Sequence, residues 1–179
     1  MRWQFWKWLF CGLESAPGIQ QFKIGWLMIH AATGVGLAFL IDEPLSEASR
    51  VILLPLTGLL VGISFAWIGN ALTLLRSDEI AALSEHHVDG LRSYVYTFQT
   101  AVLVIMVTAG LWAGAGLKMF DLVDPSPATA IALESGLYFF AALATREAWQ
   151  VVMGSQELLL TRSFIRQNAP PSKSDSSAT

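Results

Sequence analysis

The chain has little cysteine, little histidine and little charge. Its 179 residues include one cysteine and three histidines, and 14% of them are charged, against about 25% in an ordinary soluble domain. A single cysteine excludes an intramolecular disulfide scaffold. The formal net charge of −3 argues against nucleic acid as a partner, because phosphate binding needs an excess of Lys and Arg. A disordered chain is excluded too, since it would have low hydrophobicity and a high net charge.

The sequence contains long apolar stretches with almost no charged residues. Hydrophobic residues make up 54% of the chain, and they gather in four stretches. Each stretch is close to the roughly 20 residues that a helix needs to cross the lipid bilayer. Continuous blocks favour helices over the alternating strands of a barrel. We therefore expect an all-α, polytopic integral membrane protein with four transmembrane helices in one bundle. These spans cover residues 24–41, 51–75, 95–117 and 127–145.

The basic residues indicate the direction of the spans. Only Arg50 and Lys118 fall on one side of the predicted bundle, and the other Lys and Arg residues fall on the side that holds both termini. The positive-inside bias places this second side in the cytoplasm. We expect a cell membrane location, in a bacterial inner membrane, with both termini cytoplasmic.

Four segments outside the spans are expected to lie on the cytoplasmic side, at the end of the bundle that holds both termini. Residues 1–23 open with aromatic residues mixed with Arg2 and Lys7, which is typical of an amphipathic segment in the headgroup layer. Apolar residues three and four apart predict helices in the loop 76–94 and in an extension over 146–166. Residues 167–179 form a polar tail that is expected to be disordered.

Glu134 carries the one formal charge inside a predicted span. It follows Pro127 by about seven residues, which places it about 10 Å into the hydrocarbon at 1.5 Å per residue. A carboxylate there is costly and indicates an ion path, a proton relay or a paired polar contact. A hydrogen bond to Thr57 or a contact with Lys118 is the structural alternative.

A second polar layer is predicted near the inner face. His30, Asn70 and Gln99 lie at similar depth on three spans, at the level where Arg146 and Glu147 end the fourth. Such side chains either line a constriction in a pore or form hydrogen bonds between helices. Both interpretations stay open at this point.

Small residues predict close helix packing. Gly58, Gly62 and Ala66 recur every four residues in the second span, and Gly110 and Gly114 do so in the third. Small residues at this spacing let two helices approach closely. We expect tight packing inside the bundle or between copies of the chain.

Catalytic motifs are missing from the sequence. It contains no nucleophile elbow, phosphate-binding loop, HExxH or CxxC motif. His86 and His87 are adjacent, so their rings cannot share one helix face. We expect no enzymatic activity, no catalytic residues, no metal site and no cofactor.

Two functions remain. The first is a small homo-oligomeric cation channel or pore-forming effector, gated from the cytoplasmic side. Four helices cannot easily enclose a pore, but copies around an axis can, and rings of Glu134 would select cations. A pore predicts Glu134 and one of the inner polar residues on a common axis that faces water.

The alternative is a non-conducting adaptor or sensor that docks a soluble cytoplasmic partner. The apolar residues of the cytoplasmic helices would form its docking surface. An adaptor predicts buried polar residues and exposed apolar patches on the cytoplasmic extensions. The predicted docking residues are Leu83, Leu91, Leu160 and Ile165.

Overall fold

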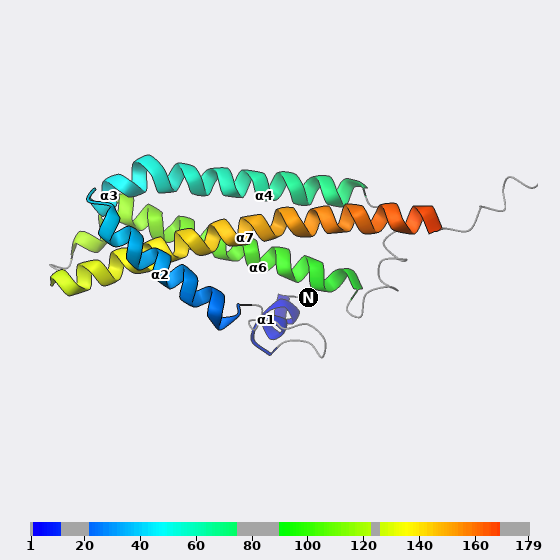
Figure 1. Cartoon of the computed structure of the whole chain (residues 1–179), viewed down its shortest axis with the longest axis horizontal. Coiled ribbons are helices and arrows are strands. Elements are labelled where there is room, and N and C mark those ends of the chain that lie inside the picture. The colour runs from blue at the N-terminus through cyan, green and yellow to red at the C-terminus, as the bar shows by residue number, and fades with distance from the viewer. Residues whose placement is uncertain (1, 12–21, 75–89, 123–125, 169–179) are drawn as a thin grey trace, which may run out of the picture.

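A computed structural model describes residues 2–11, 22–74, 90–122 and 126–168, and the elements in these ranges are all helices (Figure 1). The all-α prediction is confirmed for this part of the chain. The longer helices are α1 (Arg2–Cys11), α2 (Ile24–Leu40), α4 (Leu54–Leu74), α6 (Gly90–Gly116) and α7 (Pro127–Asn168). Shorter elements are α3 (Leu45–Ala48), the π-helical turn η2 (Ser49–Leu53) and the 3-10 turn η3 (Met119–Leu122).

Among the residues that the structure describes, three helical segments are long and apolar enough to cross a membrane. They are Leu45–Gly69, Val95–Gly116 and Pro127–Glu157, with 25, 22 and 31 residues. The structure thus places at three of the four predicted spans helices that could cross a membrane, which suggests a membrane location. The remaining one, α2, is also apolar but has only 17 residues, which corresponds to about 26 Å at 1.5 Å per residue.

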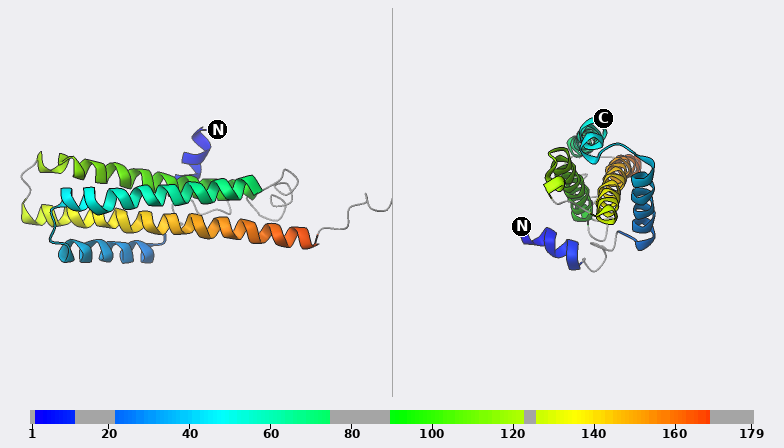
Figure 2. Two further views of the ribbon diagram at one scale, coloured as in Figure 1. Left: turned by 90° about the horizontal axis from the view of Figure 1, so that it is seen from above. Right: turned by 90° about the vertical axis from the view of Figure 1, so that its left-hand side faces the viewer.

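Helix α7 is the centre of the bundle. It packs against α2, α4 and α6, and α4 also packs against α6. The end-on view shows α2 and α6 on opposite sides of α7 (Figure 2). Helices α2, α4, α6 and α7 run in alternating directions, so that α1 and the end of α7 lie towards the same end of the bundle (Figure 1). α7 extends beyond its neighbours at this end.

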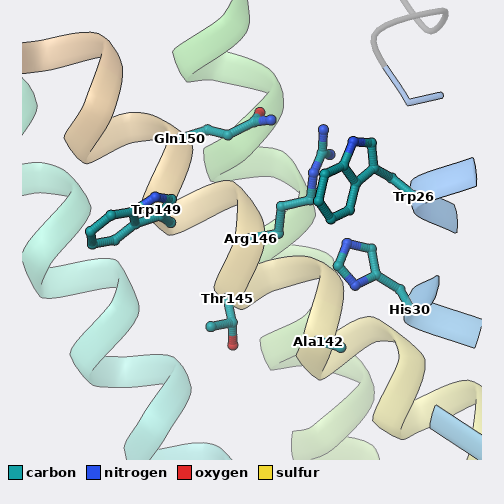
Figure 3. A pocket seen from close by; sticks show the side chains of 7 residues that line it. All are labelled: Trp26, His30, Ala142, Thr145, Arg146, Trp149 and Gln150. Atoms are coloured by element: carbon teal, nitrogen blue, oxygen red, sulfur yellow. The ribbon is translucent and has the colours of Figure 1, made fainter. Parts of the chain in front are cut away.

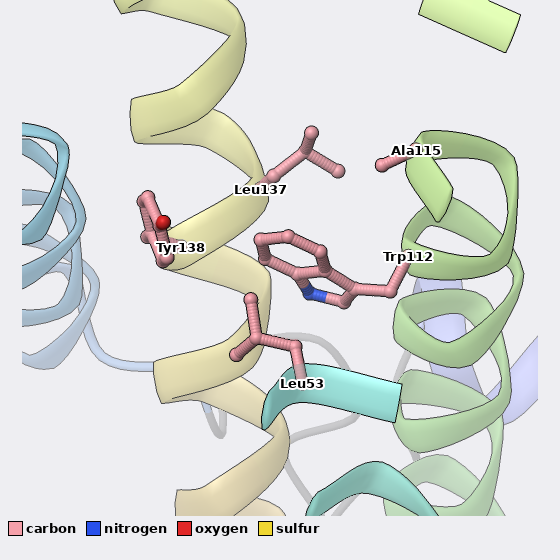
Figure 4. Close-up of a cluster of buried hydrophobic side chains, with 5 residues drawn as sticks. All are labelled: Leu53, Trp112, Ala115, Leu137 and Tyr138. Atoms are coloured by element: carbon pink, nitrogen blue, oxygen red, sulfur yellow. The ribbon is translucent and has the colours of Figure 1, made fainter. Parts of the chain in front are cut away.

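The core lies where η2, α6 and α7 meet. The Trp112 side chain is completely buried and lies between Leu53 of η2 and Leu137 and Tyr138 of α7 (Figure 4). The ring centroids of Trp112 and Tyr138 are 5.4 Å apart. Close packing of these large side chains fixes α6 against α7.

Proline explains the wide turn at the start of α4. Pro55 has no N–H group to donate one turn back along the helix, and the Leu54 N–H donates to the Ser49 carbonyl five residues back. The wide turn lies against the end of α6. There the Ser49 hydroxyl donates to the Trp112 carbonyl, and Arg50 Nε donates to the Gly116 carbonyl at 2.8 Å. Arg50 thus places a cation at the negative end of the α6 dipole.

The predicted flanking segments differ in how far the structure describes them. Helix α1 packs on α6, where Trp8 and Leu9 contact Tyr96. α7 continues without a break from the predicted fourth span into the predicted extension over 146–166. Residues 12–21, most of the loop 76–94 and most of the tail 167–179 lie outside the described residues.

Candidate functional site

A cavity of about 560 Å³ lies between α2 and α7 (Figure 3). It combines aromatic and aliphatic walls with one cation, one imidazole and one amide. Helix α2 contributes Trp26 and His30, and helix α7 contributes Ala142, Thr145, Arg146, Trp149 and Gln150. The sequence analysis singled out His30 as a polar intramembrane residue but did not place it opposite Arg146.

Close contact between α2 and α7 on one side of the cavity positions its walls. A Cβ atom added to Gly34 would lie 2.5 Å from the Ser135 carbonyl oxygen and 2.8 Å from the Phe139 nitrogen. The two backbones therefore touch at Gly34. Because α2 crosses α7 obliquely (Figure 1), the helices separate on the way to the start of α2, and the cavity lies in this part.

Sequence reasoning missed this contact although a signal was present. Gly34 and Ala38 are small residues four positions apart. The same spacing predicts close helix packing in the second and third spans. Gly34 is buried against α7, and Ala38 packs against the core cluster around Trp112. The pattern in α2 is thus a packing motif inside the bundle.

A buried ion pair supports the α7 wall of the cavity. Arg146 Nη1 donates to Glu147 Oε1 at 2.7 Å, with the Arg146 side chain 16% and the Glu147 side chain 1% exposed. The Arg146 guanidinium also lies 5.9 Å from the centroid of the Phe22 ring. A buried carboxylate needs such a partner, because an unpaired charge in a dry environment costs several kcal/mol.

His30 faces the same cavity from α2. Its ring stacks on Trp26 with 6.4 Å between the ring centroids. Among the described residues, His30 Nε2 is buried and has no hydrogen-bond partner. Figure 3 shows Trp26, His30 and the Arg146 guanidinium on one side of α7, with the Gln150 amide extending from the same side. The site therefore offers a ligand one buried nitrogen without a partner, beside a guanidinium and an amide.

Glu134 and Gln99, which were also predicted as polar intramembrane residues, do not line the cavity with His30. Glu134 is half-buried on α7, about three turns before Arg146. Gln99 is exposed on α6, which lies on the opposite side of α7 from α2 (Figure 2). The Asn70 backbone belongs to α4, but its side chain lies outside the description. The Thr57 hydroxyl, a predicted alternative partner of Glu134, donates to the carbonyl of Leu53, four residues back along the chain, at 2.7 Å.

The predicted small-residue stripe of α4 faces outward. Gly58, Gly62 and Ala66 are exposed, and a Cβ atom at either glycine would meet nothing within 4 Å. In α6, Gly110 is likewise exposed, whereas Gly114 is buried and a Cβ atom there would lie 3.7 Å from the Phe120 ring. Within one chain, close packing thus involves Gly114 but not the stripe of α4.

The predicted docking residues are described only in part. Leu160 is 70% exposed on the last part of α7, and Phe164, one turn further, is 64% exposed. Leu83 lies outside the described residues. The backbones of Leu91 and Ile165 belong to α6 and α7, but nothing is described of their side chains.

No protein-family model, no curated protein and no solved structure matches the chain. Among the described residues, no three His, Cys, Asp or Glu side chains lie close enough together to hold a metal ion. His86 and His87 lie outside those residues. Function is therefore inferred from the residues themselves.

Proposed function

We propose that the chain is a homo-oligomeric membrane adaptor that holds a soluble cytoplasmic partner at the end of α7. In this proposal α2 is the first of four transmembrane helices, and both termini lie in the cytoplasm of a bacterial cell. The short α2 is accommodated by local thinning of the bilayer, which costs fractions of a kcal/mol per Å.

The length of α7 carries the proposal. Its 42 residues correspond to about 63 Å, which is twice the roughly 30 Å of hydrocarbon. The segment after Glu157 follows the candidate membrane span and still exposes Leu160 and Phe164. Residues four apart share one helix face, and apolar anchors at this spacing are typical of helix docking. Exposed apolar groups outside the bilayer mark an interaction surface.

The arrangement of α4 supports association between copies. Its exposed glycines, Gly58 and Gly62, have the spacing that lets two membrane helices approach closely. No side chain of the same chain covers them within the described residues. A second copy that packs its own α4 against this stripe gives a symmetric contact between identical faces.

A photo-crosslinking residue at position 160 tests the docking surface. Expressed in its host membrane, the full chain is expected to give a discrete adduct with a soluble protein, and Phe164→Glu is expected to abolish this adduct. The matched control carries the crosslinker at Phe39, which is equally apolar and exposed on α2 but lies in a predicted span. Adducts of equal yield from both positions, or from neither, contradict the adaptor.

The oligomer is tested by filling the α4 stripe. Gly62→Leu adds a side chain where the single chain has room, so the fold stays intact and only the contact between copies is lost. The mass of the purified protein in detergent, measured by light scattering, is expected to fall to that of a smaller species. Gly25→Leu is the control, since Gly25 is also exposed without near neighbours. An unchanged mass in Gly62→Leu excludes this contact.

Cation conduction is the second candidate, and the position of Glu134 favours it. This carboxylate is half-buried on α7 within a candidate membrane span, where charge by default indicates an ion path. Ion flux through liposomes separates the two functions. Cation flux that falls in Glu134→Gln but not in Glu157→Gln supports a channel, whereas a stable oligomer without flux supports the adaptor.

A further inference from the structure

We propose that the cavity between α2 and α7 binds the phosphate of an anionic phospholipid. The ligands are the Arg146 guanidinium, the His30 imidazole and the Gln150 amide. The proposal depends on α2 and α7 lying in the bilayer, and it is independent of the adaptor function.

The depth of the cavity matches the phosphate layer. Arg146 lies about 19 residues beyond Pro127, the first residue of α7, which corresponds to about 28 Å along the helix. This is nearly the full hydrocarbon thickness of about 30 Å. Trp26 and Trp149 line the cavity and are exposed, and Trp is enriched at the headgroup level. Basic pockets between transmembrane helices on the cytoplasmic side are suited to anionic headgroups.

The polar groups of the cavity suit a phosphate. A guanidinium has five N–H donors, and in the described part of the chain one nitrogen of Arg146 is used by Glu147. The remaining donors can form the two parallel hydrogen bonds that phosphate oxygens accept. His30 Nε2 is buried and lacks a partner among the described residues. A phosphate oxygen that accepts from this nitrogen removes the cost of an unsatisfied buried group.

Glu147 accepts from the guanidinium but does not line the cavity. Its side chain is 1% exposed, and it is not among the residues that line the cavity. The carboxylate accepts from Nη1 of the guanidinium and offsets its positive charge in part. The donors on the other nitrogens are left for the ligand, and their hydrogen bonds add to the attraction of the remaining positive charge. Lys23, directly before α2, adds a further positive charge at the same end of the bundle.

The walls indicate a lipid rather than a soluble phosphate. Trp26, Ala142 and Trp149 make the lining mostly apolar, and the cavity opens on the flank of the bundle between two helices. Its volume of about 560 Å³ lies within the usual range for ligand sites of roughly 300–1,000 Å³. Apolar walls beside a phosphate site fit the glycerol and the first carbons of the acyl chains.

Native mass spectrometry of the full chain in detergent, titrated with phosphatidylglycerol or phosphatidylcholine, tests the proposal. The wild type is expected to bind phosphatidylglycerol at least tenfold more tightly. The double variant Arg146→Gln/Glu147→Gln removes the guanidinium without leaving a buried charge unpaired, and it is expected to lose this preference. His30→Leu keeps the ion pair and is expected to reduce the preference several-fold. Gln99→Leu, an exposed site on α6 away from the cavity, is expected to retain it.

Three results would overturn the proposal. The first is equal binding of both lipids by the wild type. The second is an unchanged preference in both the double variant and His30→Leu. The third comes from a lipid-free sample with inorganic phosphate: if this ion raises the melting temperature of the wild type as much as phosphatidylglycerol does, the cavity is a site for soluble phosphate and the lipid assignment is wrong.

Discussion

At the scale of single residues, Gly34 determines how closely α2 approaches α7. A Cβ atom there would lie within 3 Å of backbone atoms of Ser135 and Phe139, and backbone atoms cannot move aside as a flexible side chain can. We expect Gly34→Ala to lower the free energy of unfolding by about 1–3 kcal/mol, the usual cost of overpacking. Thermal unfolding in detergent measures this. Gly36→Ala, on the same helix with nothing within 4 Å, is expected to be neutral; equal loss in both variants contradicts the close contact.

At the scale of elements, the end of α6 depends on an unusual backbone conformation. Lys118 has φ 58°, a left-handed conformation that glycine adopts at little cost, and its N–H donates to the Ala115 carbonyl at 2.9 Å. We expect Lys118→Gly to raise the free energy of unfolding by about 0.5 kcal/mol. Lys118→Val is expected to lower it by about 1–2 kcal/mol, because a β-branched residue is strained there. Denaturant titration followed by Trp fluorescence distinguishes the variants, and the opposite order contradicts this assignment.

At the scale of the whole molecule, α1 and the end of α7 both lie in the half of the bundle where α6 begins (Figure 1). The single cysteine, Cys11, is exposed on α1. We expect a membrane-impermeant maleimide to label Cys11 only after bacterial spheroplasts are made permeable. In the double variant Cys11→Ser/Asp42→Cys, the new thiol lies in the loop after α2 and is expected to react in intact spheroplasts. The reverse labelling pattern inverts the topology.

The sequence predicted where helices lie better than which way their faces turn. Uninterrupted apolar residues predict the helices around Thr57 and Ile105, because lipid demands that each helix satisfy its own backbone. An apolar helix in lipid, however, has no polar side to mark its outer face. For this reason the sequence could not show whether the glycines of α4 face the interior or a neighbouring copy. It also did not predict the contact of Gly34 with α7.

Part of the candidate site could be predicted from depth alone. Counting residues placed His30, Arg146 and Glu147 in one layer, since the helical rise is constant. Counting could not show that α2 and α6, the helix that carries Gln99, lie on opposite sides of α7. The depth of a residue along the bundle follows from its position in its own helix. Which helices lie side by side depends on how all of them pack.

The central helix is synthesised after the three helices that pack against it. α2, α4 and α6 leave the ribosome before α7, although α7 is the helix against which all three pack. During translation α2 is therefore made before the backbone that Gly34 contacts. The bundle therefore closes only when the segment from Pro127 onwards has been made, and a nascent chain that stops before Pro127 leaves three helices without the one against which they pack.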